Sequence, residues 1–168
     1  MVWIEYGLQS AHNSTLKLIN RGHDRDCFER AVYMTRDYGI DTIAHVIIGL
    51  PKESREMIIE TADYLSGLPI QGVKIHLLYV VEGTALAEMY KKGEVRCLEM
   101  DEYVSLVVDF LEHLRADIVI HRLTGDPPRA ELIAPKWALR KTEVLNMIQK
   151  ELEKRDTWQG KHISLKII

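Results

Sequence analysis

The chain has 168 residues, of which 46% are hydrophobic and 28% charged, a composition typical of a globular protein with a packed core. Its net charge of −3 argues against a general nucleic-acid coat and leaves room only for a local basic patch. We find no export signal and no apolar run of the roughly 18 residues that a membrane helix needs. We therefore expect a cytoplasmic protein without a membrane partner.

The first predicted element is a short apolar strand at residues 3–10, which ends in polar residues. Side chains alternate along a strand, so Glu5, Gly7 and Gln9 share one face. Open α/β sheets and barrels bind ligands at the C-terminal ends of their strands. Gln9 lies at this end, and Arg21 follows twelve residues later, so the two side chains could bind opposite ends of one small polar ligand. The alternative is a loop glutamine and an arginine that stabilises a helix C-terminus.

The chain then continues as a repeat of strands and helices. The strand at residues 41–50 is apolar on both faces, which indicates burial on both sides, as in a parallel sheet. The repeat implies parallel strands joined by right-handed crossovers. The other predicted elements are a strand at 72–81 and helices at about 14–21, 25–38, 54–65 and 84–90. The expected helix caps are Asn13 or Ser14, Asp24, Ser54 and Thr84.

The last part of the chain has a different pattern. Helices are expected at 101–114 and 135–154, with a short strand at 117–121, and residues 163–168 alternate like a strand. Two prolines within 125–129 predict a stiff turn, because proline fixes the backbone and removes a donor. This turn is held by an Asp–Arg pair, or its polar residues contact an anion or nucleic acid. These residues are His121, Arg122, Asp126 and Arg129.

Three segments together resemble the second half of a radical S-adenosylmethionine (SAM) enzyme. They are IEYGLQS at 4–10, NRGH at 20–23 and IGLPKES at 48–54. The chain is most similar to the group around the catalytic subunit of Elongator, and within it to the YhcC/YtqA-type Fe-S oxidoreductases. Segments 121–129 and 158–161 resemble that narrower group. The resemblance implies an α/β fold, a partial (β/α) barrel of parallel strands with a C-terminal helical extension.

The same resemblance implies a division of the chain and a missing part. Residues 1–95 would be the C-terminal half of the barrel, and residues 96–168 an extension packed on it. Radical SAM enzymes hold a [4Fe–4S] cluster on a CxxxCxxC run, whereas this chain has only Cys27 and Cys97, far apart. We expect these two to be small buried residues on helices. The cluster loop and the first strand–helix units should lie in an N-terminal half, from the same gene or a separate chain.

Four residues are implied as contacts of SAM. The Gln9 amide would bind the ribose, because a carboxamide both donates and accepts hydrogen bonds. Arg21 would bind the SAM carboxylate through a forked contact. Ile47 and the open backbone at Gly49 would lie against the adenine. The structural alternatives are a glutamine that satisfies a turn, a helix-end charge, and two residues that only pack the barrel.

Other polar residues have roles that the resemblance leaves open. Glu5 would orient Arg21 or bind the SAM amine, or be a structural ion pair. His45 replaces an acidic SAM contact of related enzymes and would touch substrate or methionine, or be a core histidine. His76 and Tyr79 lie on opposite faces of one strand by alternation, so only one points inward, and we favour His76. The residues assigned to the substrate side are His76, Arg122 and Arg129.

The function implied for the intact protein is SAM cleavage to a 5′-deoxyadenosyl radical, with a tRNA or other RNA base as the suggested substrate. This chain alone is expected to be inactive, because it lacks the cluster motif. One alternative is a non-enzymatic half-barrel, a binding or assembly module for a separate N-terminal partner. Another is an ordinary barrel fragment with no connection to SAM.

Overall fold

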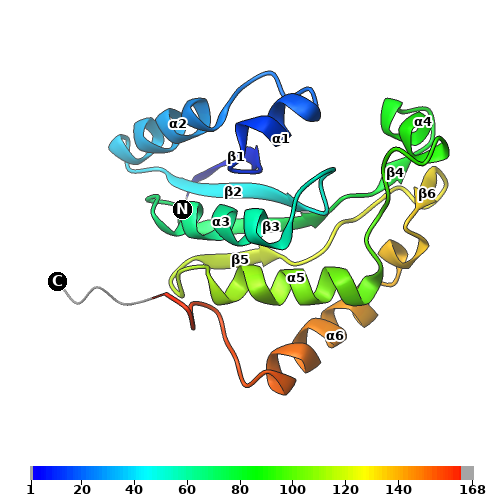
Figure 1. Cartoon of the computed structure of the whole chain (residues 1–168). Helices are drawn as coiled ribbons and strands as arrows, with labels where there is room; N and C mark the ends of the chain where they lie inside the picture. Colours follow the sequence, from blue (N-terminus) through cyan, green and yellow to red (C-terminus); the bar gives the residue numbers. More distant parts are fainter. Residues whose placement is uncertain (1, 164–168) are drawn as a thin grey trace.

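The computed structural model describes residues 2–163 and contains a four-stranded parallel sheet with helices beside it (Figure 1). Neighbouring strands are all parallel, and their order is β1-β2-β3-β5. The bounds are β1 Trp3–Gln9, β2 Asp41–Ile48, β3 Gly72–Leu77 and β5 Val119–Arg122. The prediction of an α/β partial barrel with parallel strands is confirmed.

Helices connect and cover these strands. They are α1 Asn13–Leu18, α2 Arg25–Asp37, α3 Arg55–Ser66, α4 Ala85–Lys91, α5 Met100–Glu112 and α6 Lys141–Lys154. The predicted caps Asp24, Ser54 and Thr84 each accept a hydrogen bond from a backbone N–H three residues later. The predicted cap of α1 is wrong, because Asn13 is already helical and its Oδ1 accepts from the N–H of Arg25 instead.

The core lies between the helices and one face of the sheet. Leu8, Val46 and Ile75 are at most 1% exposed and belong to one buried cluster with residues of α2, α3 and α5. α6 packs on the outside of α5 (Figure 1). None of the helices within residues 2–163 combines the length and hydropathy needed to cross a membrane.

The other face of the sheet is not buried as expected. We predicted burial on both sides of β2, yet His45 and Ile47 are only half-buried, whereas Ala44, Val46 and Ile48 are buried. Within the part of the chain that the structure describes, the helices that join the core cover one side only. We call the uncovered side, which carries Glu5, His45, Ile47, Lys74 and His76, the inner face.

Two predicted elements are divided in the structure. The strand expected at 72–81 ends at Leu77, and Val80–Val81 forms β4, which pairs antiparallel with β6 Leu132–Ala134 in a second sheet. The helix expected at 135–154 begins as a 3-10 turn, Lys136–Leu139, because Arg140 has a non-helical ψ of 49°. The strand expected at 163–168 lies outside the described residues apart from Ile163, which is not in a strand.

Candidate functional site

The centre of the inner face is a carboxylate that three neighbours share. Glu5 accepts hydrogen bonds from Lys74 Nζ at 2.6 and 2.7 Å, from His45 Nε2 at 2.8 Å and from Trp3 Nε1 at 3.2 Å. The bond from Lys74 is the main cause that lowers the pKa of Glu5 to about 2. An ionised Glu5 makes His45 Nε2 the donor, which fixes how the ring presents its other nitrogen.

Of the roles expected for Glu5, the structure shows the ion pair and, within the described residues, no contact with Arg21. Glu5 pairs with Lys74, 69 residues away in sequence, because the parallel register sets His45 opposite Lys74 and brings three strands together. Lys74 was not singled out from the sequence. Its signal was present in the alternation of β3, which places it on the same face as His76.

His45 and His76 are stacked beside this carboxylate. Their ring centroids lie 5.2 Å apart with 22° between the planes. Burial lowers the pKa of His76 to about 4, and the nearby charges of His45, Arg122 and Lys74 act in the same direction. His76 is therefore neutral near pH 7, and its buried Nε2 has no hydrogen-bond partner within the described residues.

A cavity of about 250 Å³ opens at the C-terminal end of the inner face. Gln9, His45, Ile47, His76 and Tyr79 line it together with two leucines. Four residues that we predicted from the sequence are thus brought to one place. His76 and Tyr79 both line this cavity, but the ring of Tyr79 also packs against the core cluster beside Leu77, whereas His76 stacks on His45.

Gln9 and Arg21 lie on the same side of β1, over Gly7. Arg21 Nη2 donates to the carbonyl oxygen of Gly7 at 2.7 Å. A Cβ at Gly7 would collide with Gln9 Nε2 and would lie 2.7 Å from Arg21 Nη2. Gln9 has a φ of 70°, at an irregularity in the pairing of β1 with β2. The missing side chain of Gly7 thus lets an amide and a guanidinium meet, and Arg21 Nε has no partner within residues 2–163.

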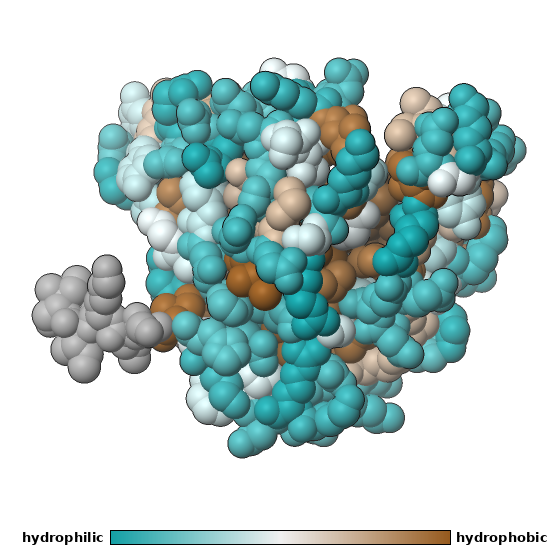
Figure 2. All heavy atoms as spheres, viewed as in Figure 1, coloured by the Kyte–Doolittle hydropathy of each residue, from teal (hydrophilic) through white to brown (hydrophobic). Residues whose placement is uncertain are grey.

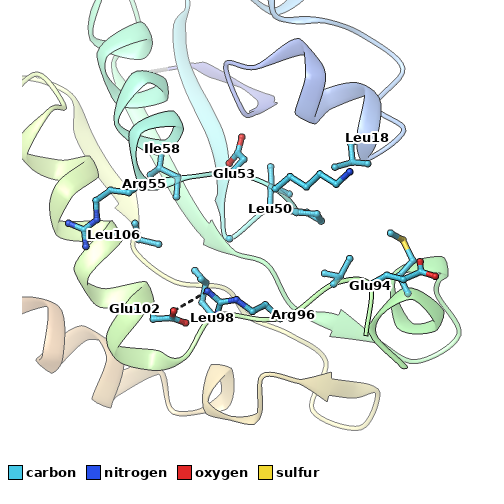
Figure 3. Close-up of a pocket in the computed structure, with 15 residues that line it drawn as sticks. Leu18, Leu50, Glu53, Arg55, Ile58, Glu94, Arg96, Leu98, Glu102 and Leu106 are labelled. Carbon is cyan, nitrogen blue, oxygen red and sulfur yellow. Dashed lines mark hydrogen bonds and ion pairs between the residues drawn. The ribbon is translucent and has the colours of Figure 1, made fainter. Parts of the chain in front are cut away.

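Gly49 lines a different and larger cavity, of about 590 Å³. Figure 3 shows the walls of this cavity, which come from the end of α1, the loop after β2, α3, the end of α4, the segment that leads into α5, and α5 itself. Leu98 lies 3.0 Å from the position of a Cβ at Gly49. Arg96 pairs with Glu102 across the cavity wall at 2.8 Å. Figure 2 shows the molecule hollowed in this region, next to α4.

Glu53 links the ends of β1 and β2 and is one of the residues that line the larger cavity. Its carboxylate accepts a hydrogen bond from the hydroxyl of Ser10, and burial raises its pKa. The same Ser10 hydroxyl accepts from the N–H of His12 at 3.1 Å. Sequence reasoning missed Glu53 as an anchor, although it lies within the predicted segment 48–54. It holds the strand end that carries Gln9.

Of the three residues assigned to the substrate side, the structure places Arg129 apart from His76 and Arg122. Arg122 is opposite Lys74 in the β3–β5 pairing and is half-buried. Arg129 is exposed in the loop before β6. Within the described residues no ion pair joins Asp126 to Arg129, so the Asp–Arg account of the turn is wrong. Other contacts hold this region, among them Tyr103 Oη, which donates to the carbonyl of Leu123 at 3.0 Å.

The chain does not fit an iron–sulfur cluster by itself. Cys27 and Cys97 are half-buried, and Cys97 lies in a loop, not on a helix as expected. Burial raises the pKa of Cys97 to about 11, which disfavours the thiolate that a cluster needs. Within residues 2–163 no group of three or more His, Cys, Asp or Glu side chains is arranged to hold a metal ion.

Comparison with protein families agrees with this geometry. Residues 1–65 match the radical SAM superfamily, and residues 70–154 match the radical SAM C-terminal domain. The chain belongs to the radical SAM superfamily. It spans about half the length of two curated relatives that it matches. The alternative of a barrel fragment unrelated to this family is therefore excluded.

Individual relatives place the chain near the Elongator branch. It is 46% identical to the YtqA protein of Bacillus subtilis over 160 residues, 95% of this chain and 50% of that one. It is 27% identical to a tRNA uridine(34) acetyltransferase of Methanocaldococcus infernus, over 90% of this chain and 28% of that one. The solved structure of Elp3 from the same archaeon matches with a TM-score of 0.82 at 24% identity, over 94% of this chain and 37% of that one.

Proposed function

We propose that this chain is the SAM-binding half of a radical SAM enzyme. The observation that carries the proposal is the meeting of Gln9 and Arg21 over Gly7, beside the cavity on the inner face. An amide and a guanidinium with an unpartnered nitrogen match the two polar ends of SAM, its ribose and its amino-acid carboxylate. SAM bound at a reduced cluster supplies a 5′-deoxyadenosyl radical.

Each residue of this site has a separate task in the proposal. The Gln9 amide accepts from one ribose hydroxyl and donates to the other. Arg21 binds the carboxylate while one of its nitrogens stays fixed on the Gly7 carbonyl. Ile47 packs against the adenine in the cavity. Gly49 lines the larger cavity, where a Cβ would lie 3.0 Å from Leu98. It has no side chain, so only its backbone could contact the adenine.

The cluster must come from other residues, because the two cysteines do not fit it. We propose that an N-terminal half, from the same gene or a separate chain, supplies the cysteine loop. It would pair with the outer edge of β1, since within the described residues the only strand that pairs with β1 is β2. The same free edge is what the alternative function requires, that of a non-enzymatic assembly module.

The proposed substrate is a base of tRNA. The support is the likeness to proteins named tRNA uridine(34) acetyltransferase and Elongator complex protein 3. A cavity that ends beside a neutral His76 suits an uncharged heteroaromatic ring. Fold alone does not determine function, so the substrate class rests on this likeness and on the cavity together.

Calorimetric titration of the chain with SAM tests the proposal. Arg21→Ala and Gln9→Ala should each weaken binding, Arg21→Ala by roughly tenfold or more, because a charge-assisted hydrogen bond contributes about 1.5–3 kcal/mol. Arg36→Ala and Gln149→Ala are matched controls, since both side chains are exposed and bond only to neighbours on their own helix. Unchanged affinity in both Gln9→Ala and Arg21→Ala would refute the site.

A further inference from the structure

Two cations of the inner face are in different states. Lys74 binds the Glu5 carboxylate through two hydrogen bonds, whereas Arg122 has no such partner within the described residues. Arg122 lies opposite Lys74 in the β3–β5 pairing. Within the described residues no carboxylate lies within ion-pair distance of Arg122, and no hydrogen bond involves its guanidinium. A half-buried guanidinium in that state has binding capacity to spare.

A bulge in β5 is the reason that Arg122 reaches this face. Val73 pairs with Ile120, but the next residue of β3, Lys74, pairs with Arg122, so His121 is an extra residue. The His121 Nε2 lies 2.6 Å from the position of a Cβ at Gly72, which is on the same face as Lys74. Two consecutive basic side chains therefore share one face, which regular alternation forbids and a bulge permits.

His76 completes the arrangement next to Arg122. Arg122 is paired with Lys74, and His76 follows Lys74 by two residues on the same face of β3, so Arg122 and His76 are diagonal neighbours across the β3–β5 pair. The Nε2 of His76 is buried and has no partner within residues 2–163. A neutral imidazole can donate one hydrogen bond, and an arginine can donate several in a fixed fork. Together they offer donors to one small oxyanion at the edge of the cavity.

We propose that Arg122 and His76 form an oxyanion subsite on the inner face, separate from Gln9 and Arg21, which binds a phosphate or carboxylate of the substrate. The proposal deepens the function proposed above, since it names a chemical group that the substrate of the enzyme carries. A phosphate would belong to the nucleic-acid backbone, and a carboxylate to a small organic substrate. Arg122 supplies the charge, and His76 adds a donor without charge.

Nuclear magnetic resonance of the chain tests this subsite without SAM. The probes are inorganic phosphate and malonate, added in separate titrations while the ring of His76 and the Nε–H of Arg122 are observed. We expect one probe at least to shift both signals and to raise the pKa of His76 above about 4, because a bound anion favours the charged ring. The stronger probe identifies phosphate or carboxylate as the source.

Substitutions test whether Arg122 is responsible for the binding of phosphate or malonate. Arg122→Gln should weaken binding of the stronger probe roughly tenfold or more, whereas Arg36→Gln, at an exposed helix position, should not change it. Equal binding by Arg122→Gln would overturn the subsite. If that variant fails to fold, the unmodified chain still decides, since an Arg122 Nε–H signal that neither probe moves overturns it too.

This outcome is independent of the SAM site. Phosphate or malonate binding with no SAM binding would support the subsite and reject the proposed function. SAM binding with no effect of either anion on Arg122 would support the proposed function and reject the subsite. Gln9→Ala serves as the cross-check, because it should weaken SAM binding and leave the anion titration unchanged.

Discussion

At the scale of single residues, a glycine decides whether the proposed site can form. Gly7 leaves room for two side chains that come from different parts of the chain, the end of β1 and the loop after α1. The groups that crowd this position are the far ends of flexible side chains. A larger residue there can therefore displace them without disturbing the backbone.

Gly7→Ala should give a folded chain that has lost SAM affinity. The added methyl group would push the Gln9 amide and the Arg21 guanidinium away from the space over β1. Unfolding in urea should change by about 1 kcal/mol or less, while the titration with SAM should weaken severalfold or more. Gly22→Ala is the control, because nothing lies within 4 Å of its Cβ position. Equal SAM affinity in Gly7→Ala and Gly22→Ala would contradict the proposed SAM contacts of Gln9 and Arg21 over Gly7.

His76 should make stability depend on pH between about 6.5 and 4. In this window the unfolded chain binds a proton that the folded ring rejects, because its folded pKa is lowered from 6.5 to about 4. Stability therefore falls as the pH falls through the window. After a discount for solvent exposure the loss is on the order of 1–2 kcal/mol.

Urea unfolding at pH 7 and pH 5 measures this effect. His76→Gln should lose less stability than the unmodified chain between the two pH values, whereas His23→Gln, at an exposed position, should lose as much as the unmodified chain. A His76→Gln variant with the full pH dependence would show that another group is responsible.

At the scale of elements, features that depend on neighbouring residues could be predicted from the sequence, whereas features that depend on strand pairing could not. The caps Asp24, Ser54 and Thr84 follow from the sequence because each bond spans only three residues. The end of β3 at Leu77 does not, because the residues after it are as apolar as those before it and belong to another sheet.

The residues of the candidate site likewise fall into those that could be predicted from the sequence and those that could not. The resemblance predicts Gln9, His45 and Ile47 as site residues and alternation favours His76, and the structure brings the four to one cavity. Lys74 was missed as the partner of Glu5, since that pairing depends on the register of three strands. The β5 bulge depends on the pairing with β3, so the sequence of residues 119–122 alone does not predict it. The division of the chain into 1–95 and 96–168 stays a prediction.

The packing of α6 against α5 should depend on the buried carboxylate of Asp109. Asp109 of α5 is 5% exposed and binds Arg155, just after α6, at 2.7 Å and Arg55 of α3 at 2.8 Å. Asp109→Ala leaves Arg155 without this partner in a partly buried place, which should cost about 2–4 kcal/mol. Asp37→Ala breaks only an exposed pair with Arg36 and should cost under about 1 kcal/mol.

The measurement for this prediction is urea unfolding, together with hydrogen exchange of the α6 amides. Asp109→Ala should speed exchange in α6 more than in β2. If both variants unfold at the same urea concentration, the buried network does not hold α6.

At the scale of the whole molecule, the chain combines a complete hydrophobic core with an incomplete site. One side of the sheet is closed by helices, and the other exposes polar side chains and a cavity. The N-terminal half proposed above would both supply a cysteine run and cover the edge of β1, which has no strand partner on that side within residues 2–163. We therefore expect no SAM cleavage from this chain after iron and sulfide are added, and cleavage would contradict that expectation.

The central claim is that the strand ends on the inner face bind SAM. Amide chemical shifts of the chain during titration with SAM test it most directly, because they distinguish the two cavities. We predict the largest shifts at Gly7, Gln9, Arg21 and Ile47. Shifts confined to the larger cavity at Arg96 and Leu98, or none at all, would contradict it.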